Sequence, residues 1–146
     1  MEVFVSMLDK NLRYINHEII NNELYIYVES KRDEVKCPYC GKSTTKEHSR
    51  YERSFQDLPV QGKKTVIVLI NRKMFCNNPD CPHKTFGERF DFLEYKAKKT
   101  KRLKDEIIKV ALRQSSVSAS SYLSDSIAKV RKSTICNYLK KIRNSD

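Results

Sequence analysis

The feature that most constrains this chain is a set of four cysteines arranged in two close pairs. Cys37 and Cys40 enclose Pro-Tyr, Cys76 and Cys81 enclose Asn-Asn-Pro-Asp, and 35 residues separate the two pairs. Two short turns that each present two thiolates form the ligand arrangement of a structural Zn²⁺ site. The insert is long enough to contain strands that bring the turns together. The sequence therefore predicts one structural Zn²⁺ ion held by Cys37, Cys40, Cys76 and Cys81.

The first pair has an alternative interpretation, because Cys-Pro-Tyr-Cys is also a motif of glutaredoxin-type thiol redox proteins. Such a site needs a helix directly after the motif, which lowers the pKa of the nucleophilic thiol. Residues 41–45 instead indicate a polar turn, in which Gly41 is placed for the left-handed conformation. A redox site would also leave the second pair unexplained. Disulfides are disfavoured because the N-terminal apolar run is too short for a secretory signal.

Three further residues bear on the metal site. His48 lies in the insert and His83 follows the second pair, so either could replace a cysteine as the fourth ligand. We expect both histidines at the surface, and their participation stays open. Cys136 falls within a helical pattern, where a free cysteine behaves as a small apolar residue.

The basic charge of the chain is concentrated in its last third. Residues 1–95 contain 15 basic and 14 acidic side chains, whereas residues 96–146 contain 14 and 4. A segment of this positive density typically contacts nucleic-acid phosphates. No apolar run approaches the ~20 residues that cross a bilayer, so we expect no membrane partner. Double-stranded DNA is the expected partner, and the expected location is cytoplasmic and nucleoid-associated.

The spacing of apolar residues changes near the same place as the charge. Residues 13–20 and 24–29 predict a hairpin, and residues 50–56 and 65–75 predict two antiparallel strands joined by a turn at 57–62. With the two cysteine turns, these strands describe a zinc-ribbon-like module. We expect a β-rich four-cysteine zinc-binding domain over residues 1–95.

From about residue 100 the period is helical, and three amphipathic helices are expected. The pattern predicts a basic three-helix helix-turn-helix domain over residues 96–146, and hence an α+β fold. The first expected helix is Lys101–Gln114, whose buried face contains Leu103, Ile107, Val110 and Ala111 and is widened by Ile108 and Leu112. A short second helix, after a break at Ser115 and Ser116, buries Ala119, Leu123 and Ile127. The third is Thr134–Arg143, which is capped by Ser133 and buries Ile135, Leu139 and Ile142.

The outward face of the last helix is the predicted recognition surface. Asn137 has the donor and acceptor pair that reads adenine, whereas the lysines suit phosphates or guanine. Arg50, Arg53, Lys63 and Lys64 could add a secondary contact. The predicted DNA-binding residues are Arg131, Lys132, Ser133, Thr134, Asn137, Lys140 and Lys141 on and before that helix, and Lys98, Lys99, Lys101 and Arg102 in the basic connection to the helices.

Several strings together carry a family resemblance. They are Cys37-Pro-x-Cys-Gly, His48-Ser-Arg-Tyr-x-Arg, Asp57-Leu-Pro, Arg72-Lys-x-Phe-Cys-Asn-Asn-Pro-x-Cys-Pro, Thr85-Phe-x-Glu and, downstream, Val130-Arg-Lys-Ser-Thr-Ile. This pattern resembles the N-terminal zinc-binding part and following helix-turn-helix of ISL-three family insertion-sequence transposases. The resemblance implies a protein that recognises the terminal inverted repeats of its own mobile element in DNA transposition and recombination.

Those transposases continue into a ribonuclease-H-like domain in which three acidic residues hold two metal ions. Nothing around Asp57, Asp80 or Asp91 predicts such a scaffold. We therefore expect a truncated transposase that binds DNA and is not an enzyme, with a second copy or the full-length transposase as further partner. The alternatives are a stand-alone transposase-derived regulator or repressor and, less favoured, a thiol redox protein using Cys37 and Cys40.

Overall fold

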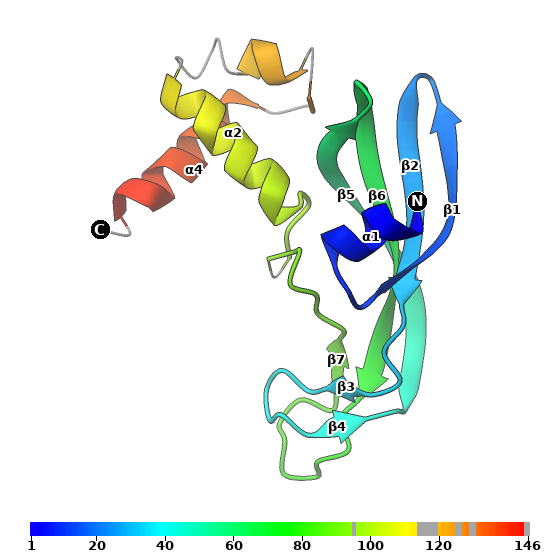
Figure 1. Cartoon of the computed structure of the whole chain (residues 1–146). Coiled ribbons are helices and arrows are strands. Elements are labelled where there is room, and N and C mark those ends of the chain that lie inside the picture. The colour runs from blue at the N-terminus through cyan, green and yellow to red at the C-terminus, as the bar shows by residue number, and fades with distance from the viewer. Residues whose placement is uncertain (95, 114–119, 125–126, 129–130, 145–146) are drawn as a thin grey trace.

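A twisted β-sheet forms the body of the protein, with helices beside one end and a small cysteine-bearing module at the other (Figure 1). The computed structural model of the chain describes residues 1–94, 96–113, 120–124, 127–128 and 131–144. The elements are α1 (Glu2–Leu8), β1 (Leu12–Ile20), β2 (Glu23–Ser30), β3 (Val35–Lys36), β4 (Ser43–Thr44), β5 (Glu47–Val60), β6 (Lys63–Phe75), β7 (Thr85–Gly87), α2 (Lys101–Arg113) and α4 (Lys132–Asn144). Residues 120–124 are also helical.

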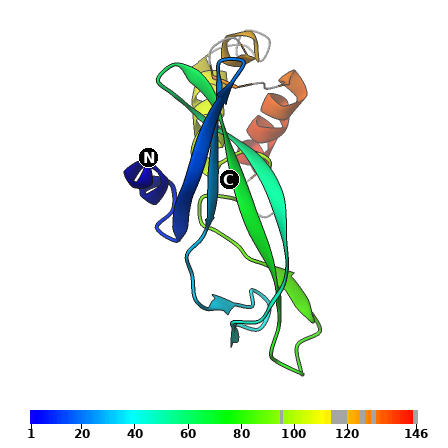
Figure 2. The same cartoon turned by 90° about the vertical axis from the view of Figure 1, so that its right-hand side faces the viewer.

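Strand β6 is the central strand of the large sheet, whose order is β1-β2-β6-β5. β5 pairs antiparallel along one edge of β6. Along the other edge, β2 pairs in parallel from Thr65 to Ile70 and β7 pairs antiparallel from Lys73 to Phe75. Figure 2 shows β5 and β6 as long twisted strands that continue beyond β1 and β2 to the cysteine module. The pair β5 and β6 therefore connects the two ends of the molecule.

The two hairpins predicted from the sequence are present. Both turns have two central residues with positive φ, Asn21 and Asn22 in the first and Gln61 and Gly62 in the second. This backbone matches the right-handed twist of paired strands, and Asn and Gly adopt it at low cost. The strands are therefore confirmed, with tighter turns than the sequence indicated.

The expected turn at residues 57–62 was wrong in its extent. β5 runs through this segment to Val60, so only Gln61 and Gly62 form the loop. The register of β5 on β6 shifts between Asp57 and Val60, an irregularity that accommodates Pro59 within a strand. Asp57 suggested a turn, but it lies within β5, and its carboxylate is fully buried and hydrogen-bonded to Arg102.

One face of the sheet carries the main core. Alternate residues of β2 and β6 are buried side by side, with Ile26 opposite Ile67 and Val28 opposite Leu69. Val5 of α1, a helix that the sequence analysis did not predict, covers this face together with Phe90 and Phe92 from the chain after β7.

A second core lies among the helices. It contains most of the apolar residues that the helical spacing predicted. Its members are Leu103, Ile107, Val110, Ala111, Leu123, Ile127, Ala128 and Ile135, and Leu58 of β5 packs against them. Two expectations were wrong, because Leu112 is 69% exposed and Ile142 is 40% exposed. The last helix also begins at Lys132, so Ser133 lies inside it. Ala119, Ser115 and Ser116 fall outside the described residues.

The buried carboxylate of Asp57 joins the sheet to the first of these helices. Its Oδ1 accepts hydrogen bonds from the Thr100 hydroxyl and from Nε of Arg102, both at 2.8 Å, and Oδ2 accepts one from Arg102 Nη2. The Thr100 hydroxyl oxygen also accepts the N–H of Leu103 at 3.3 Å, which caps the start of α2. The same three residues therefore fix where α2 begins and hold it against β5.

No helix within the described part of the chain is both long and apolar enough to cross a membrane.

Replacing Asp57 by alanine should lower the free energy of unfolding by about 3 kcal/mol, because it leaves the Arg102 guanidinium and the Thr100 hydroxyl without their partner. Urea unfolding followed by circular dichroism measures this change. The control is Arg13→Ala, which breaks the exposed pair with Glu29 and should cost less than about 1 kcal/mol. Equal losses in the two variants would show that Asp57 does not anchor the helices.

Candidate metal centre

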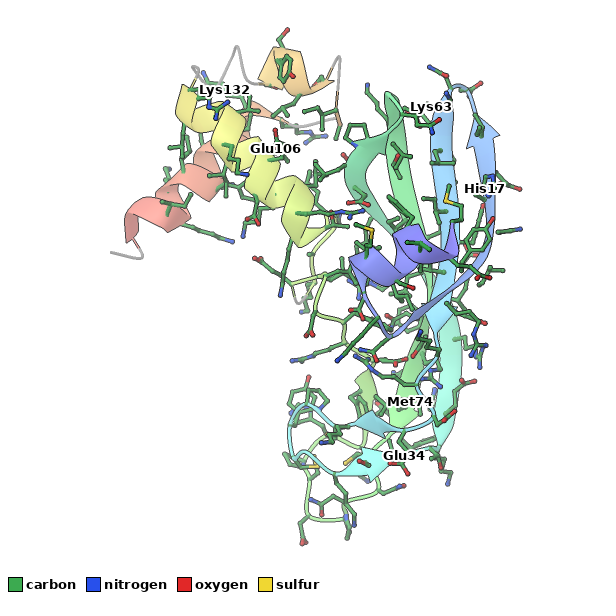
Figure 3. The ribbon with its side chains drawn as sticks, viewed as in Figure 1. His17, Glu34, Lys63, Met74, Glu106 and Lys132 are labelled. Carbon is green, nitrogen blue, oxygen red and sulfur yellow. The ribbon has the colours of Figure 1, made fainter. Side chains whose placement is uncertain are left out.

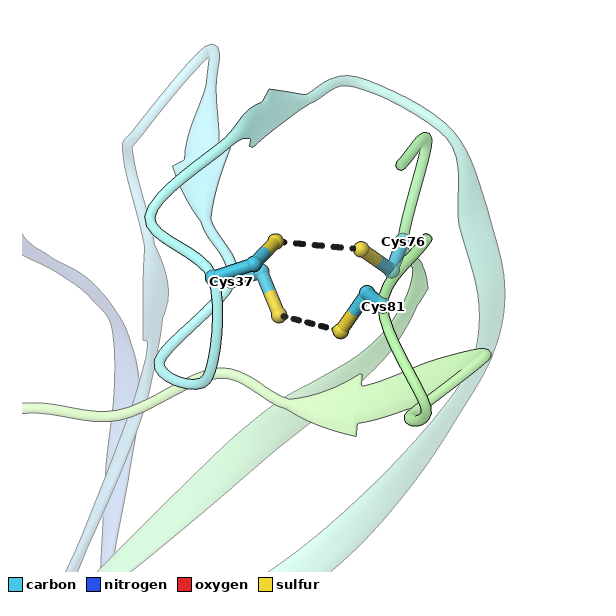
Figure 4. A group of neighbouring side chains, drawn as sticks. Cys37, Cys76 and Cys81 are labelled. Atoms are coloured by element: carbon cyan, nitrogen blue, oxygen red, sulfur yellow. Dashed lines mark hydrogen bonds between the residues drawn. The ribbon is translucent and has the colours of Figure 1, made fainter. Parts of the chain in front are cut away.

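The four cysteines of the two pairs converge on one point at the end of the sheet (Figure 4). Their Sγ atoms all lie within 4.8 Å of one another. The distance is 4.0 Å between Cys37 and Cys81 and 3.5 Å between Cys40 and Cys76. Tetrahedral zinc with Zn–S bonds of ~2.3 Å places its sulfurs about 3.8 Å apart. The cluster therefore has the dimensions of a site for one Zn²⁺ ion.

The first cysteine turn lies between β3 and β4. The N–H of Cys37 donates to the carbonyl of Lys42 at 3.0 Å, and the N–H of Gly41 donates to the carbonyl of Cys37 at 2.8 Å. Gly41 has a φ of +79°, the left-handed conformation that the sequence predicted. Glycine adopts this conformation without the strain that a side chain would add.

The second cysteine turn follows β6 directly. The N–H of Cys76 donates to the carbonyl of Lys84 at 2.9 Å, and the N–H of Cys81 donates to the carbonyl of Asn78 at 3.1 Å. The side-chain oxygen of Asn78 accepts the N–H of Asp80 at 3.0 Å. Asn78 thus organises the longer loop of this pair, as Asn commonly does in turns.

The electrostatics of the four sulfurs favour a cation between them. A backbone hydrogen bond from Lys42 lowers the pKa of Cys40 to about 7. A backbone hydrogen bond at Asn78 lowers the pKa of Cys76, but desolvation and the neighbouring sulfurs outweigh it and raise that pKa to about 12. The Cys40 thiol therefore loses its proton most readily, and its negative charge opposes ionisation of the other thiols. A bound dication removes this repulsion, so metal binding would release protons.

The four-cysteine cluster packs on a core of only a few side chains. Val35, Met74 and Phe86 are buried with Cys37 and Cys81. Met74 projects from the end of β6 toward the module formed by β3 and β4 (Figure 3). Because so small a core contributes little burial energy, metal coordination would supply much of the stability of this module.

A buried ionic network links the cysteine module to the sheet, where β2 stops pairing with β6 and β7 begins. Glu88 is 3% exposed and accepts two hydrogen bonds from Arg72, at 2.9 and 3.2 Å. The Ser30 hydroxyl and Arg32 also donate to it, at 2.6 and 3.2 Å. The bond to Glu88 raises the pKa of Arg72. Arg72 and Glu88 occur in the family strings of the sequence, but no local pattern there indicates that they pair.

Both histidines, His48 and His83, are exposed, as expected. In the described part of the chain the group with metal-binding spacing comprises the four cysteines alone. The His83 ring stacks on Tyr39 with centroids 3.6 Å apart, and His48 lies 4.9 Å from the Phe75 ring. Cys40 is followed by β4, where a redox motif of the glutaredoxin kind needs a helix. Cys136 is half-buried on α4.

Residues 33–81 match a family model described as the zinc-finger of transposase IS204/IS1001/IS1096/IS1165. The match supports the resemblance to ISL-three transposases. It contains all four cysteines and covers less than half of the chain. Together with the cluster geometry it supports the predicted cofactor, one Zn²⁺ ion. No curated protein and no solved structure matches the chain.

The predicted DNA-binding residues differ in their surroundings, and their contact with DNA stays a prediction. Burial lowers the pKa of Lys99, and the positive charge of Lys98 adds to this. Arg102 is bound by Asp57, and Lys64 donates to the carbonyl of Ser124, so both have structural partners. Exposed residues are Lys98, Lys101, Arg131, Lys132, Ser133, Asn137, Lys140 and Lys141; Lys99 and Thr134 are half-buried.

The purified protein should contain one zinc per chain, measured by native mass spectrometry. Zinc should protect four of the five thiols from alkylation, and a chelator should expose them, because coordinated thiolates react slowly. Cys81→Ser should lose zinc, whereas the control Cys136→Ser should retain it and show no reactive thiol. Full zinc in Cys81→Ser would exclude this ligand set.

Proposed function

We propose that this chain is the DNA-binding part of an insertion-sequence transposase and that it recognises the terminal inverted repeats of its element. The exposed face of α4 is the observation that carries this proposal. Residues 120–124 and α4 act as the helix-turn-helix pair, and α2 supports them. The zinc-finger match at residues 33–81 supports the transposase origin.

α4 has the two faces that a recognition helix requires. Its Ile135 is fully buried in the helical core with Leu103 and Ile107 of α2. Asn137 and Lys140 are exposed on the other side of the helix. A helix held in this way can enter a major groove while its inner face remains packed.

The connection before α2 adds a positive surface beside α4. A hollow of about 220 Å³ lies between this connection and the helices. Lys104 there is paired with Glu94 at 3.0 Å, so part of its charge is already compensated. The basic residues that line the hollow besides Lys104 bring positive charge to this surface, and such charge holds phosphates and sets the orientation of a recognition helix. They are Lys96, Lys98, Lys99, Lys101 and Lys141.

Asn137→Ala should weaken binding to a terminal-repeat duplex by about tenfold and leave a scrambled duplex unaffected, because a base contact is lost. Lys140→Gln should weaken both duplexes and make the salt dependence shallower by about one unit of slope, because one phosphate contact is lost. Fluorescence anisotropy over a series of salt concentrations measures both effects.

The matched control is Lys36→Gln on β3, which removes the same charge at the opposite end of the molecule from α4 (Figure 1). It should change neither affinity nor salt dependence. Equal affinity of the unaltered protein for terminal-repeat and scrambled duplexes would exclude sequence-specific recognition. An effect of Lys36→Gln as large as that of Lys140→Gln would exclude α4 as the contact.

We also propose that this chain performs no strand cleavage or transfer by itself. Both carboxylate oxygens of Asp57 are occupied by Arg102 and Thr100, which makes this residue unsuited to hold a catalytic Mg²⁺ ion. The protein with Mg²⁺ should leave a supercoiled plasmid carrying the element ends intact on agarose gels. Nicking that Asp57→Asn, Asp80→Asn or Asp91→Asn abolishes would overturn this proposal.

A further inference from the structure

A cleft of about 760 Å³ lies on the sheet side of the basic connection, away from the α4 face. Its walls come from five segments of the chain. β5 contributes Tyr51 and the stretch from Arg53 to Gln56, and β6 contributes Val66. The other three segments are Tyr39 in the first cysteine turn, residues 87–89 at and after the end of β7, and Lys96 to Lys98 in the connection. Two backbone hydrogen bonds close one end, from the Gln56 N–H to Lys98 and from the Thr100 N–H to Gln56, each at 3.0 Å.

The lining of the cleft is strongly positive. Arg53, Arg89, Lys96 and Lys98 line it, and the acidic residue among its lining groups is Glu88. The carboxylate of Glu88 is already bound by Arg72 and Arg32. Arg53 lies 4.8 Å from the Phe55 ring and donates through Nη2 to the carbonyl of Ala97 at 3.4 Å. A guanidinium has five N–H donors, so most of the donors of Arg53 remain for a ligand.

An aromatic ring is held in a fixed position in the same cleft. Tyr51 is 42% exposed, and its hydroxyl accepts a hydrogen bond from Nδ2 of the buried Asn71 at 3.1 Å. Gly87 borders this ring, and a Cβ atom there would lie only 3.1 Å from the Tyr51 hydroxyl. A side chain at this position would therefore displace Tyr51 or narrow the cleft.

One polar group of the lining lacks a protein partner. Oε1 of Gln56 is buried and accepts no hydrogen bond from any part of the chain that the structure describes. Gln56 also lines a second hollow with Lys64 and Ile127, and its Oε1 is closed to solvent, so this atom is not a contact offered to a ligand in the cleft. The cations and the exposed aromatic ring of the cleft together match two parts of a nucleotide, the phosphate and the face of the base.

We propose that this cleft binds an unpaired segment of a DNA strand, as a second contact separate from α4. Basic grooves that contain exposed aromatic rings bind single strands through phosphate pairing and base stacking. The volume lies in the range of ~300–1,000 Å³ found for small-molecule and cofactor sites, so the cleft takes one or a few nucleotides and is too small for a duplex. This inference rests on the proposed DNA-binding function.

The position of the cleft connects it to both other sites. Lys96 and Lys98 line this cleft and also the basic hollow beside α4. A strand that leaves a duplex on α4 therefore has a continuous positive path into the cleft. At the far end, Tyr39 lies between the two cysteines of the first turn, so the wall there depends on the shape of the zinc module.

The test compares a fluorescein-labelled oligothymidine of about 12 nucleotides with a terminal-repeat duplex by anisotropy. Tyr51→Leu should weaken oligothymidine binding about tenfold, because stacking on the ring is lost. Tyr51→Phe should retain binding within about twofold, because it keeps the ring. Arg53→Gln should weaken oligothymidine binding and make its salt dependence shallower. Lys10→Gln, at an exposed residue before β1 that does not line the cleft, should change neither.

Photo-crosslinking provides a second readout that does not depend on variants. An oligothymidine that contains 5-iodouracil should crosslink to Tyr51 of the unaltered protein, located by mass spectrometry of the tryptic peptides. Crosslinks confined to α4 would overturn the proposal.

The failures of the two proposals are distinguishable. If Lys140→Gln weakens duplex binding while the Tyr51 and Arg53 variants leave oligothymidine binding unchanged, the cleft proposal fails and the α4 proposal stands. If the cleft variants weaken duplex and oligothymidine equally, the cleft follows duplex backbone and the unpaired-strand proposal is overturned. If neither set of variants affects any DNA, both proposals fail.

Discussion

The convergence of four thiols within 4.8 Å of one another is the constraint on which the rest of the structure depends. Two turns separated by 35 residues can meet only if the intervening chain returns to its starting point, and β5 and β6 provide this return. Four sulfurs this close disfavour joint ionisation, so the arrangement is stable mainly with a cation among them. Zinc in this site therefore stabilises the ends of the long strands as well as the small module.

The basic residues of the chain divide into two groups with different tasks. Arg72 and Arg102 are bound to buried carboxylates, and they hold the cysteine module and α2 on the sheet. Removing either partner would leave an uncompensated charge near the protein interior, which is costly. Residues such as Lys140 are exposed and are suited to contact a ligand. Net charge alone does not distinguish these groups, because both contribute equally to it.

Features encoded by neighbouring residues were predictable from the sequence. The cysteine turns, both hairpins and the apolar side of α2 follow from spacing within a few residues. Features that depend on distant partners were not. The pairing of Asp57 with Arg102 joins residues 45 positions apart, and Ile142 is 40% exposed although its spacing from Ile135 and Leu139 placed it on the buried side of α4. The cleft could not be foreseen because its walls come from five separated segments.

Strand β6 has a mechanical consequence for any ligand that touches both ends of the molecule. Its thirteen residues span ~43 Å at the usual rise per residue. Because it is hydrogen-bonded on both edges, it holds the helices and the zinc module at a fixed distance from each other. Inserting one residue would rotate the module to the opposite side of the sheet, since side chains alternate with period two. Inserting two would keep its facing and add ~7 Å. The distance and the facing of the module are thus set together by β6 and its partner β5.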